Sequence, residues 1–172
     1  MAAKTGTYTL IGSSTLGSAA SSVTFSSIPG TYTDLVLVVA SVTNASSTNS
    51  VFLRFNSDSG SNYSSTFLEG NGTAASSNRL SSRTVIDSGY NVGLSTTSVG
   101  QVTFNIMDYA NATTFKTVIS RFAQAVGAAP GTSATVSLWR STAAITSVEI
   151  RCDVNMGIGT TFKLYGIEAG NL

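Results

Sequence analysis

Histidine is absent from the sequence, cysteine occurs once, and charged residues make up only 10% of the chain. The absence of histidine removes the commonest general base, the Ser-His and Cys-His nucleophile systems, and most zinc and copper sites. With Cys152 alone, no internal disulfide can form. Lysines and arginines are scattered singly and the net charge is +1, so a nucleic-acid partner is not expected.

Long hydrophobic runs are also missing. The longest, Leu35 to Ala40, is far too short to cross a bilayer. No apolar stretch follows the N-terminal residues Met1 to Gly6, so we expect neither a secretion signal nor a membrane anchor. We therefore expect no membrane partner and no bound cofactor.

Serine, threonine, glycine and asparagine take the place of the charged residues, while 42% of the chain is hydrophobic. Apolar residues alternate with polar ones, or form short runs between turn residues, and helical periodicity is hard to find. The run Asp34 to Val42 is the strongest strand, and its unbroken apolar centre predicts burial on both faces. A long loop is expected from Glu69 to Ser82, because that segment is rich in Gly, Asn, Ser and Thr.

These patterns predict an all-β protein with little or no helix. About ten strands in one domain suggest an antiparallel two-sheet β-sandwich, jelly-roll-like in topology. We expect residues 1–172 to form one domain with an extended N-terminal arm at residues 1–6. The predicted strands are Thr7 to Ile11, Ser22 to Phe25, Asp34 to Val42, Val51 to Phe55, Tyr63 to Leu68, Arg83 to Ile86, Val99 to Met107, Thr114 to Gln124, Ala134 to Arg140, Ile145 to Val154 and Thr160 to Ile167.

The segment from Leu53 to Ser64 predicts a hairpin, because Asn, Ser, Asp and Gly fill the space between two strand-like ends. Asn56, Asp58 and Asn62 place oxygen atoms at alternating positions, like a calcium loop. The comparison with an EF-hand is poor, since the loop lacks its first carboxylate, sixth glycine and twelfth glutamate. These three residues are weak calcium candidates, and a structural turn is the preferred interpretation.

Catalytic equipment is sparse. A glycosidase needs two carboxylates in one cleft, and the sequence cannot show whether any two of its acidic residues converge. In the strand around Cys152, the apolar even positions predict a core face, and Glu149, Arg151 and Asp153 predict an exposed ladder of charges. Cys152 is then a core residue. We expect no enzyme, and a carbohydrate-active enzyme is the least favoured alternative.

Binding residues are harder to assign. Trp139 and Arg140 form a possible sugar-stacking platform, although a single Trp at a strand end is more often part of the core. The expected loop from Glu69 offers Glu69 and Asn71 as contact residues. Met1 and Lys4, in the N-terminal segment, could reach a neighbouring subunit.

Three parts of the sequence resemble small virion structural proteins of tailed bacteriophages, especially marine and cyanobacterial phages. The first runs from Ala20 to Val38 and the second from Leu53 to Ser64. The third combines Leu138-Trp139, Ala144 to Ser147 and the closing Phe162 to Ile167. The likeness extends from about Tyr8 to Ile167 and brings no catalytic residues with it.

This resemblance implies a place on the virion, made in the host cytoplasm. The leading hypothesis is a capsid decoration (cement) protein on the outer capsid surface, bound to the major capsid protein and self-associated as a homotrimer. The alternative is a tail-fibre or knob module that binds host surface polysaccharide. The number of copies per particle separates the two, since a decoration protein repeats over the whole lattice.

Overall fold

The computed structural model describes residues 7–43, 50–89, 94–125 and 130–168. These residues form twelve strands and no helix, and therefore no helix that could span a membrane. Every strand pairing is antiparallel. The strands are β1 (Tyr8–Thr15), β2 (Ala20–Phe25), β3 (Asp34–Ser41), β4 (Phe52–Phe55), β5 (Tyr63–Gly70), β6 (Ala75–Arg83), β7 (Ile86–Asp87), β8 (Gly100–Ile106), β9 (Lys116–Gln124), β10 (Gly131–Trp139), β11 (Val148–Met156) and β12 (Thr161–Ile167).

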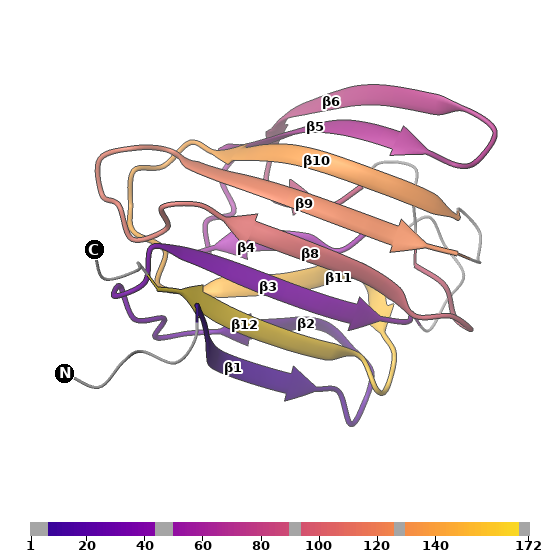
Figure 1. Ribbon diagram of the computed structural model, residues 1–172, viewed down its shortest axis with the longest axis horizontal. Coiled ribbons are helices and arrows are strands. Elements are labelled where there is room, and N and C mark those ends of the chain that lie inside the picture. Colours follow the sequence, from indigo (N-terminus) through magenta and orange to yellow (C-terminus); the bar gives the residue numbers. More distant parts are fainter. Residues whose placement is uncertain (1–6, 44–49, 90–93, 126–129, 169–172) are drawn as a thin grey trace.

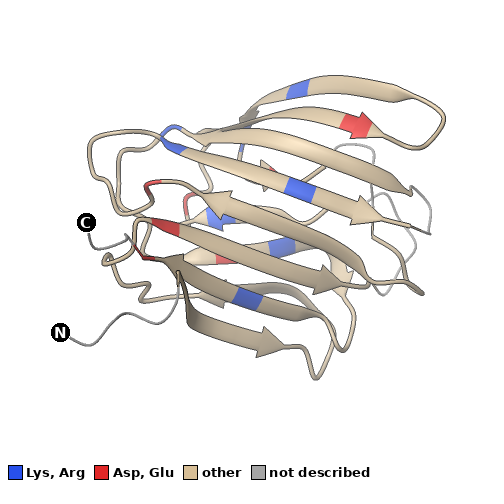
Figure 2. Cartoon of the chain, in the orientation of Figure 1, with Lys and Arg blue, Asp and Glu red and all other residues tan. Residues whose placement is uncertain are grey.

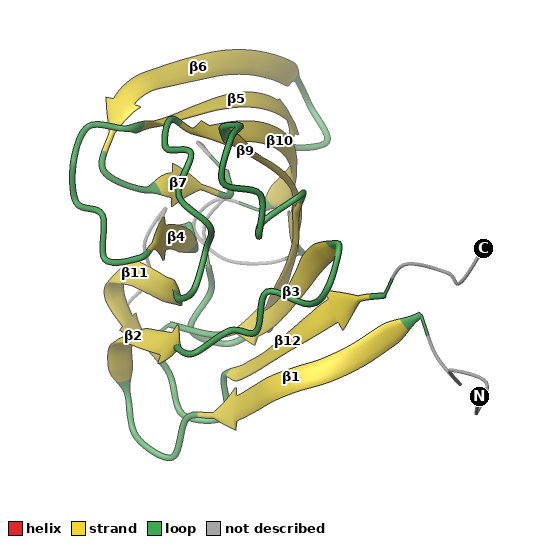
Figure 3. Cartoon of the chain, turned by 90° about the vertical axis from the view of Figure 1, so that its left-hand side faces the viewer, coloured by secondary structure: helices red, strands yellow, loops and turns green. Residues whose placement is uncertain are grey.

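The strands are divided unequally between two sheets (Figure 1). The larger sheet has eight strands in the order β1-β12-β3-β8-β9-β10-β5-β6, and the smaller has four in the order β2-β11-β4-β7. Figure 3 shows the larger sheet curving around the smaller one, so that β5 and β6 bend over β7. The predicted two-sheet β-sandwich is confirmed. The jelly-roll topology is not confirmed.

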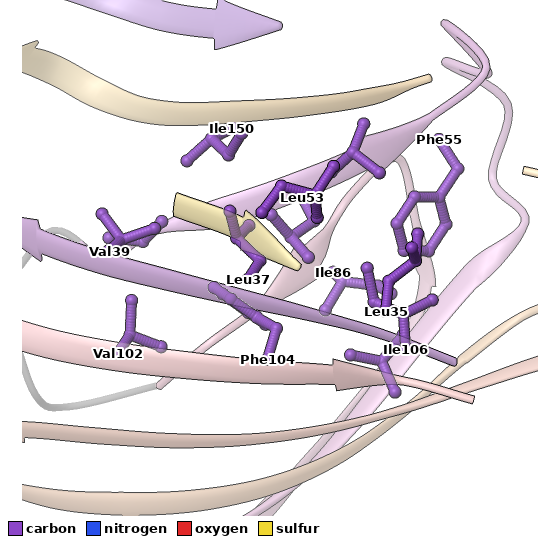
Figure 4. Close-up of a cluster of buried hydrophobic side chains, with 14 of the residues drawn as sticks. Leu35, Leu37, Val39, Leu53, Phe55, Ile86, Val102, Phe104, Ile106 and Ile150 are labelled. Atoms are coloured by element: carbon purple, nitrogen blue, oxygen red, sulfur yellow. The ribbon is translucent and has the colours of Figure 1, made fainter. Parts of the chain in front are cut away.

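The core lies between the two sheets and follows from alternation along the strands. Leu35, Leu37 and Val39 of β3 point inward from the larger sheet, while Leu53 and Ile150 face them from the smaller sheet (Figure 4). Full burial of each such side chain contributes roughly 1.5–3 kcal/mol. The predicted core position of Cys152 is confirmed by its burial.

The opposite side of β3 is less covered than its sequence predicted. Val36 is buried there, but Val38 and Ala40 are only partly buried. The prediction of burial on both faces is thus right for part of the strand. The reason is that, among the described residues, no further layer covers this side of the larger sheet (Figure 3).

The loop predicted from Glu69 to Ser82 is wrong. Strand β5 continues to Gly70, a short turn follows, and β6 begins at Ala75. The sequence of β6, ASSNRLSSR, has no core face of its own and gives no alternating pattern. It becomes a strand because β5 offers it a continuous row of backbone partners along the edge of the sheet.

The hairpin predicted from Leu53 to Ser64 is also wrong. Strand β4 pairs with β11 and β7 in the smaller sheet, whereas β5 pairs with β10 and β6 in the larger one. The tight turn is present, since the Asp58 amide donates to the Phe55 carbonyl across Asn56 and Ser57, both with positive φ. The turn carries the chain from one sheet to the other, because the side chains of Asn56 and Asp58 hold it there.

Candidate functional site

The connection between β4 and β5 is held by the carboxylate of Asp58. Its Oδ2 accepts hydrogen bonds from the Trp139 indole N–H at 2.7 Å and from the Asn62 amide at 3.0 Å. Its Oδ1 accepts the Gly60 backbone N–H at 2.8 Å. Burial alone would raise the pKa of Asp58, but these hydrogen bonds outweigh burial, and the pKa is lowered. Both oxygens of the ionised carboxylate are therefore occupied by N–H donors.

Asn56 ties the same connection to the segment before β11. Its amide nitrogen donates to the Ala144 carbonyl at 2.8 Å. Its amide oxygen accepts the backbone N–H groups of Thr146 at 2.9 Å and of Ser147 at 3.1 Å. From the other side, the Arg140 guanidinium donates to the Ser61 carbonyl at 2.7 Å. Together with the bond from Trp139 of β10 to Asp58, these contacts join the smaller and larger sheets at this end of the sandwich.

Aromatic packing completes this region. The Tyr63 hydroxyl accepts the Phe55 amide and donates to the Asp58 carbonyl, both at 3.1 Å. The rings of Tyr63 and Trp139 are stacked with centroids 6.2 Å apart. Burial raises the pKa of Tyr63 to about 12, so its hydroxyl remains a hydrogen-bond donor at neutral pH. We call the set Asn56, Asp58, Asn62, Tyr63 and Trp139 the inter-sheet clasp.

The clasp accounts for much of the sequence that carries the phage resemblance. The stretch from Leu53 to Ser64, the pair Leu138-Trp139 and the stretch from Ala144 to Ser147 meet here. The three calcium candidates all belong to the clasp, where their side-chain groups bond to protein atoms. The preferred interpretation of a structural turn therefore agrees with the geometry.

The predicted contact residues that the structure describes do not all come together at one site. Trp139 is 2% exposed, so its interpretation as a core residue is confirmed. Glu69 is buried on β5, and Asn71 is exposed in the following turn, where its side-chain oxygen accepts the amides of Thr73 and Ala74. Met1 and Lys4, with the whole arm at residues 1–6, lie outside the described residues.

Charged groups gather on the side of the smaller sheet that faces away from the core. Arg83 binds Asp87 through two hydrogen bonds of 3.2 and 3.0 Å, and Arg54 lies 3.4 Å from Glu149 on the neighbouring strand. Burial raises the pKa of Asp87 more than its bonds to Arg83 lower it. Within the described residues, no three His, Cys, Asp or Glu side chains form a group that could hold a metal ion. This surface is a set of ion pairs between strands.

Two further reactive side chains are buried and engaged. Burial raises the pKa of the Cys152 thiol, which donates to the Ser50 carbonyl. Desolvation lowers the pKa of Lys116, whose ammonium donates to the carbonyls of Thr114 at 2.7 Å and Thr142 at 3.2 Å. Both contacts join neighbouring segments of the sandwich and give no open site.

Strand β10 has the polarity opposite to that of an ordinary core strand. At its centre the inward side chains are Ser133, Thr135 and Ser137, all buried, while Val136 between them points outward and is 54% exposed. The inward hydroxyls are hydrogen-bonded: Ser137 pairs with Ser65 at 2.8 Å, and Thr135 donates to the Ser88 carbonyl at 3.2 Å. Hydrogen bonds thus replace apolar packing below the centre of β10, where Val136 lies on the surface, while Trp139 at the end of the strand packs in the core.

The same surface continues across the larger sheet. We call it the outer face, meaning the side of the larger sheet turned away from the smaller one. Strand pairing places its residues in rows that cross the sheet. One row is Tyr165, Val36, Asn105, Ile119, Val136, Thr66 and Arg79, the next is Lys163, Val38, Thr103, Arg121, Ala134, Leu68 and Ser77, and a third is Thr161, Ala40, Gln101, Ala123, Thr132, Gly70 and Ala75.

A shallow groove of about 580 Å³ lies on this face and crosses β8, β9, β10 and β5. Small residues of the third row, Ala123, Thr132 and Gly70, leave the hollow. Larger side chains of the second row, Arg121 and Leu68, border it. Leu68 is 65% exposed. The groove is therefore a direct result of side-chain size in two adjacent rows.

The charges on the outer face are basic. Figure 2 shows them on β6, β9 and β12, where Arg79, Arg121 and Lys163 are exposed. All eight acidic residues lie in the described part of the chain. Among the outward positions of the eight strands of the larger sheet, only Asp34 is acidic. Asp34 begins β3 at the end of the sheet and accepts the Asp108 backbone N–H. The outer face thus combines exposed apolar side chains with a weak positive charge.

Sequence reasoning missed this face. The alternation in β10 is visible in the sequence, but it does not say which set of residues is buried, and apolar residues are the usual choice for the inside. A possible signal was the run of alternating hydroxyl residues, Ser133, Thr135 and Ser137, opposite the serine-rich start of β5.

Comparison with known proteins gives no family. No family model matches the chain, and no curated protein matches it. Among solved structures, the chain is similar to a protein of unknown function from Shewanella oneidensis MR-1, with 12% identity and a TM-score of 0.26, over 98% of this chain and 79% of that one. A likeness at this level supports no inference about function.

Proposed function

We propose that this protein is a virion structural protein of a tailed bacteriophage, without enzymatic activity, and that it acts as a capsid decoration protein. In this proposal the outer face of the larger sheet binds the major capsid protein and braces neighbouring capsid subunits. The sequence resemblance supports a place on the virion, and the exposed apolar residues of the outer face support its role as the attachment surface.

The observation that carries the proposal is the inverted polarity of β10. Exposed apolar surface costs about 25 cal/mol per Å² relative to burial, so a strand that served only the core would turn Val136 inward. Exposed Leu68 lies on the neighbouring strand, and Tyr8 and Leu10 are exposed at the far edge of the same face. Four of the eight large hydrophobic side chains that are exposed among the described residues thus lie on this face, and exposed apolar patches are characteristic of interaction sites.

Three of the eight acidic side chains and the one thiol are engaged within the fold, which supports a role without catalysis. Asp58, Asp87 and Glu149 are each engaged by N–H donors or guanidinium groups, and the Cys152 thiol is buried. A catalytic acid or nucleophile needs an accessible reacting atom beside its base or partner. The main features of the described residues are the inter-sheet clasp, which holds the fold together, and the outer face, which is open to a partner.

Purified virions test this proposal. Quantitative mass spectrometry of the particle should give copies in the hundreds, since a decoration protein repeats over the capsid lattice. Light scattering on the isolated protein should give a homotrimer. A count of a few copies, or absence from the particle, would overturn the decoration role.

A second candidate, a tail-fibre or knob module for host polysaccharide, is favoured by the groove of about 580 Å³ with Gln101, Thr103 and Thr132 in its lining. Amide and hydroxyl groups of this kind can bind sugar hydroxyls. Binding on a glycan array, inhibition of phage adsorption by the isolated protein, and a low copy number would favour this candidate over the first.

A further inference from the structure

We propose that the groove on the outer face binds an acidic, extended segment of a protein partner, with Arg121 as the residue that receives its carboxylate. This inference rests on the proposed function and specifies the chemistry of the partner. It starts from a charged group that the fold leaves without a counterion.

Arg121 lies in the middle of the row Thr103, Arg121, Ala134 and Leu68, and borders the groove. Within the described residues, the hydrogen bonds and ion pairs leave its guanidinium unengaged, whereas Arg54, Arg83 and Arg140 are each bound. A guanidinium offers five N–H donors in a planar fork that fits a carboxylate with two parallel hydrogen bonds. An acidic group is therefore the complement of this position.

The side chains around Arg121 favour a peptide over a sugar. Leu68, Ala123 and Ala134 give the groove apolar walls and floor. Phe122, the one aromatic residue of its described lining, is buried and points into the core, so none of these described residues presents an aromatic ring for a sugar to stack on. Aliphatic side chains beside an acidic one would cover this surface, and they would bury Leu68 as well.

A second basic residue, Lys163, sets the spacing that we expect between two acidic residues of the partner segment. Lys163 lies in the same row as Arg121, three strands away across Thr103 and Val38. Adjacent strands are about 4.8 Å apart, which separates the two positions by about 14 Å, and four residues of an extended chain cover about 13 Å. A segment with acidic residues at positions i and i+4 can therefore reach both cations.

The probe is a synthetic peptide, acetyl-Val-Thr-Val-Glu-Val-Thr-Val-Glu-Val-amide, compared with the same peptide carrying Gln for both Glu. Titration into the full-length protein, followed by NMR of the arginine side-chain N–H signals, should shift the Arg121 signal. We expect the Glu peptide to bind roughly tenfold more tightly than the Gln peptide, with a loss of affinity as salt is raised.

Variants locate the site. Arg121→Gln should lower the affinity for the Glu peptide roughly tenfold, and Arg121→Lys should lower it less, because charge remains without the planar fork. The matched control is Arg79→Gln, on the same face but on β6 and outside the groove lining, which should leave the affinity unchanged.

Equal binding of the two peptides, no binding of either, or equal losses in Arg121→Gln and Arg79→Gln would overturn the inference. Tighter binding of oligogalacturonate than of the Glu peptide would also overturn it, by assigning the groove to an acidic polysaccharide. The copy number on the virion is measured separately, so a wrong partner chemistry can be told apart from a wrong function.

Discussion

The fold leaves no room for a side chain at Gly166. A Cβ atom at this position would lie 2.3 to 2.5 Å from three ring atoms of Tyr32, which covers the glycine. We expect Gly166→Ala to lower the free energy of unfolding by about 1–3 kcal/mol through overpacking. Urea unfolding followed by the fluorescence of Trp139, the single Trp of the chain, measures this.

The control for this substitution is Gly17→Ala, because a Cβ there meets nothing within 4 Å. Its stability should stay close to that of the wild type. Tyr32→Ala should remove the clash, so the double variant should lose less stability than the sum of the two single changes. Additive losses would show that Gly166 is required for another reason.

Asp58 should make the free energy of unfolding depend on pH in the acid range. Its pKa is lowered in the folded protein, below the value of about 3.9 in an unfolded chain, so its contribution is fully present above about pH 4 and is lost as pH falls through the folded pKa. Asp58→Asn removes the charge and should cost about 1–3 kcal/mol at neutral pH. The stability difference between wild type and variant should therefore shrink as the pH falls below about 4. A constant difference would contradict this account.

The connection between β4 and β5 depends on Asn56 in two ways. Its φ of 50° is left-handed, which asparagine tolerates, and its side chain binds the segment from Ala144 to Ser147. Asn56→Gly keeps the backbone conformation and loses the side-chain bonds, at a cost of about 1–3 kcal/mol. Asn56→Ala should cost about 1 kcal/mol more, from backbone strain. Chemical denaturation of both variants checks the order, and an equal loss would contradict it.

Most strands could be predicted from the sequence, because alternation and turn residues are local signals. The partner of a strand is not local, which is why β4 and β5 were expected to form a hairpin. The same asparagine, aspartate and glycine residues make a tight turn whether or not the chain returns to its own sheet. What separates the two outcomes is the contact of Asn56 and Asp58 with residues about eighty to ninety positions later in the sequence.

Strand β6 was missed for a different reason. Its residues carry no apolar alternation, since neither of its faces contributes to the core. Its pairing comes from the backbone of β5, which a pattern of side chains cannot report. Edge strands with polar sequences are therefore the elements that this kind of reasoning predicts least well.

The candidate site depends on which side of the larger sheet is covered, a property of the complete sandwich. The sequence of β10 contains two alternating sets. In the sandwich its hydroxyl set faces the segment that follows β7, where Thr135 donates to the Ser88 carbonyl, so Val136 faces outward. The residues first proposed as contacts were chosen as aromatic or as loop residues. Trp139 became part of the core instead, and Glu69 part of a strand.

The outer face can be tested in the assembled particle. Leu68→Lys and Val136→Lys each place a charge where a partner would cover apolar surface, and burial of an unpaired charge is costly. The two exposed positions should tolerate lysine in the free protein, with changes in unfolding free energy of about 0.5 kcal/mol or less. Occupancy on virions, measured by quantitative mass spectrometry, should fall strongly.

Ile158→Lys is the matched control, because Ile158 is 68% exposed but lies in the turn between β11 and β12, away from the rows of the outer face. Occupancy of this variant should match the wild type. If all three variants bind virions at the wild-type level, the outer face is not the docking surface. An equal loss in all three would show only a general effect of added charge, and the inverted polarity of β10 would then need another explanation.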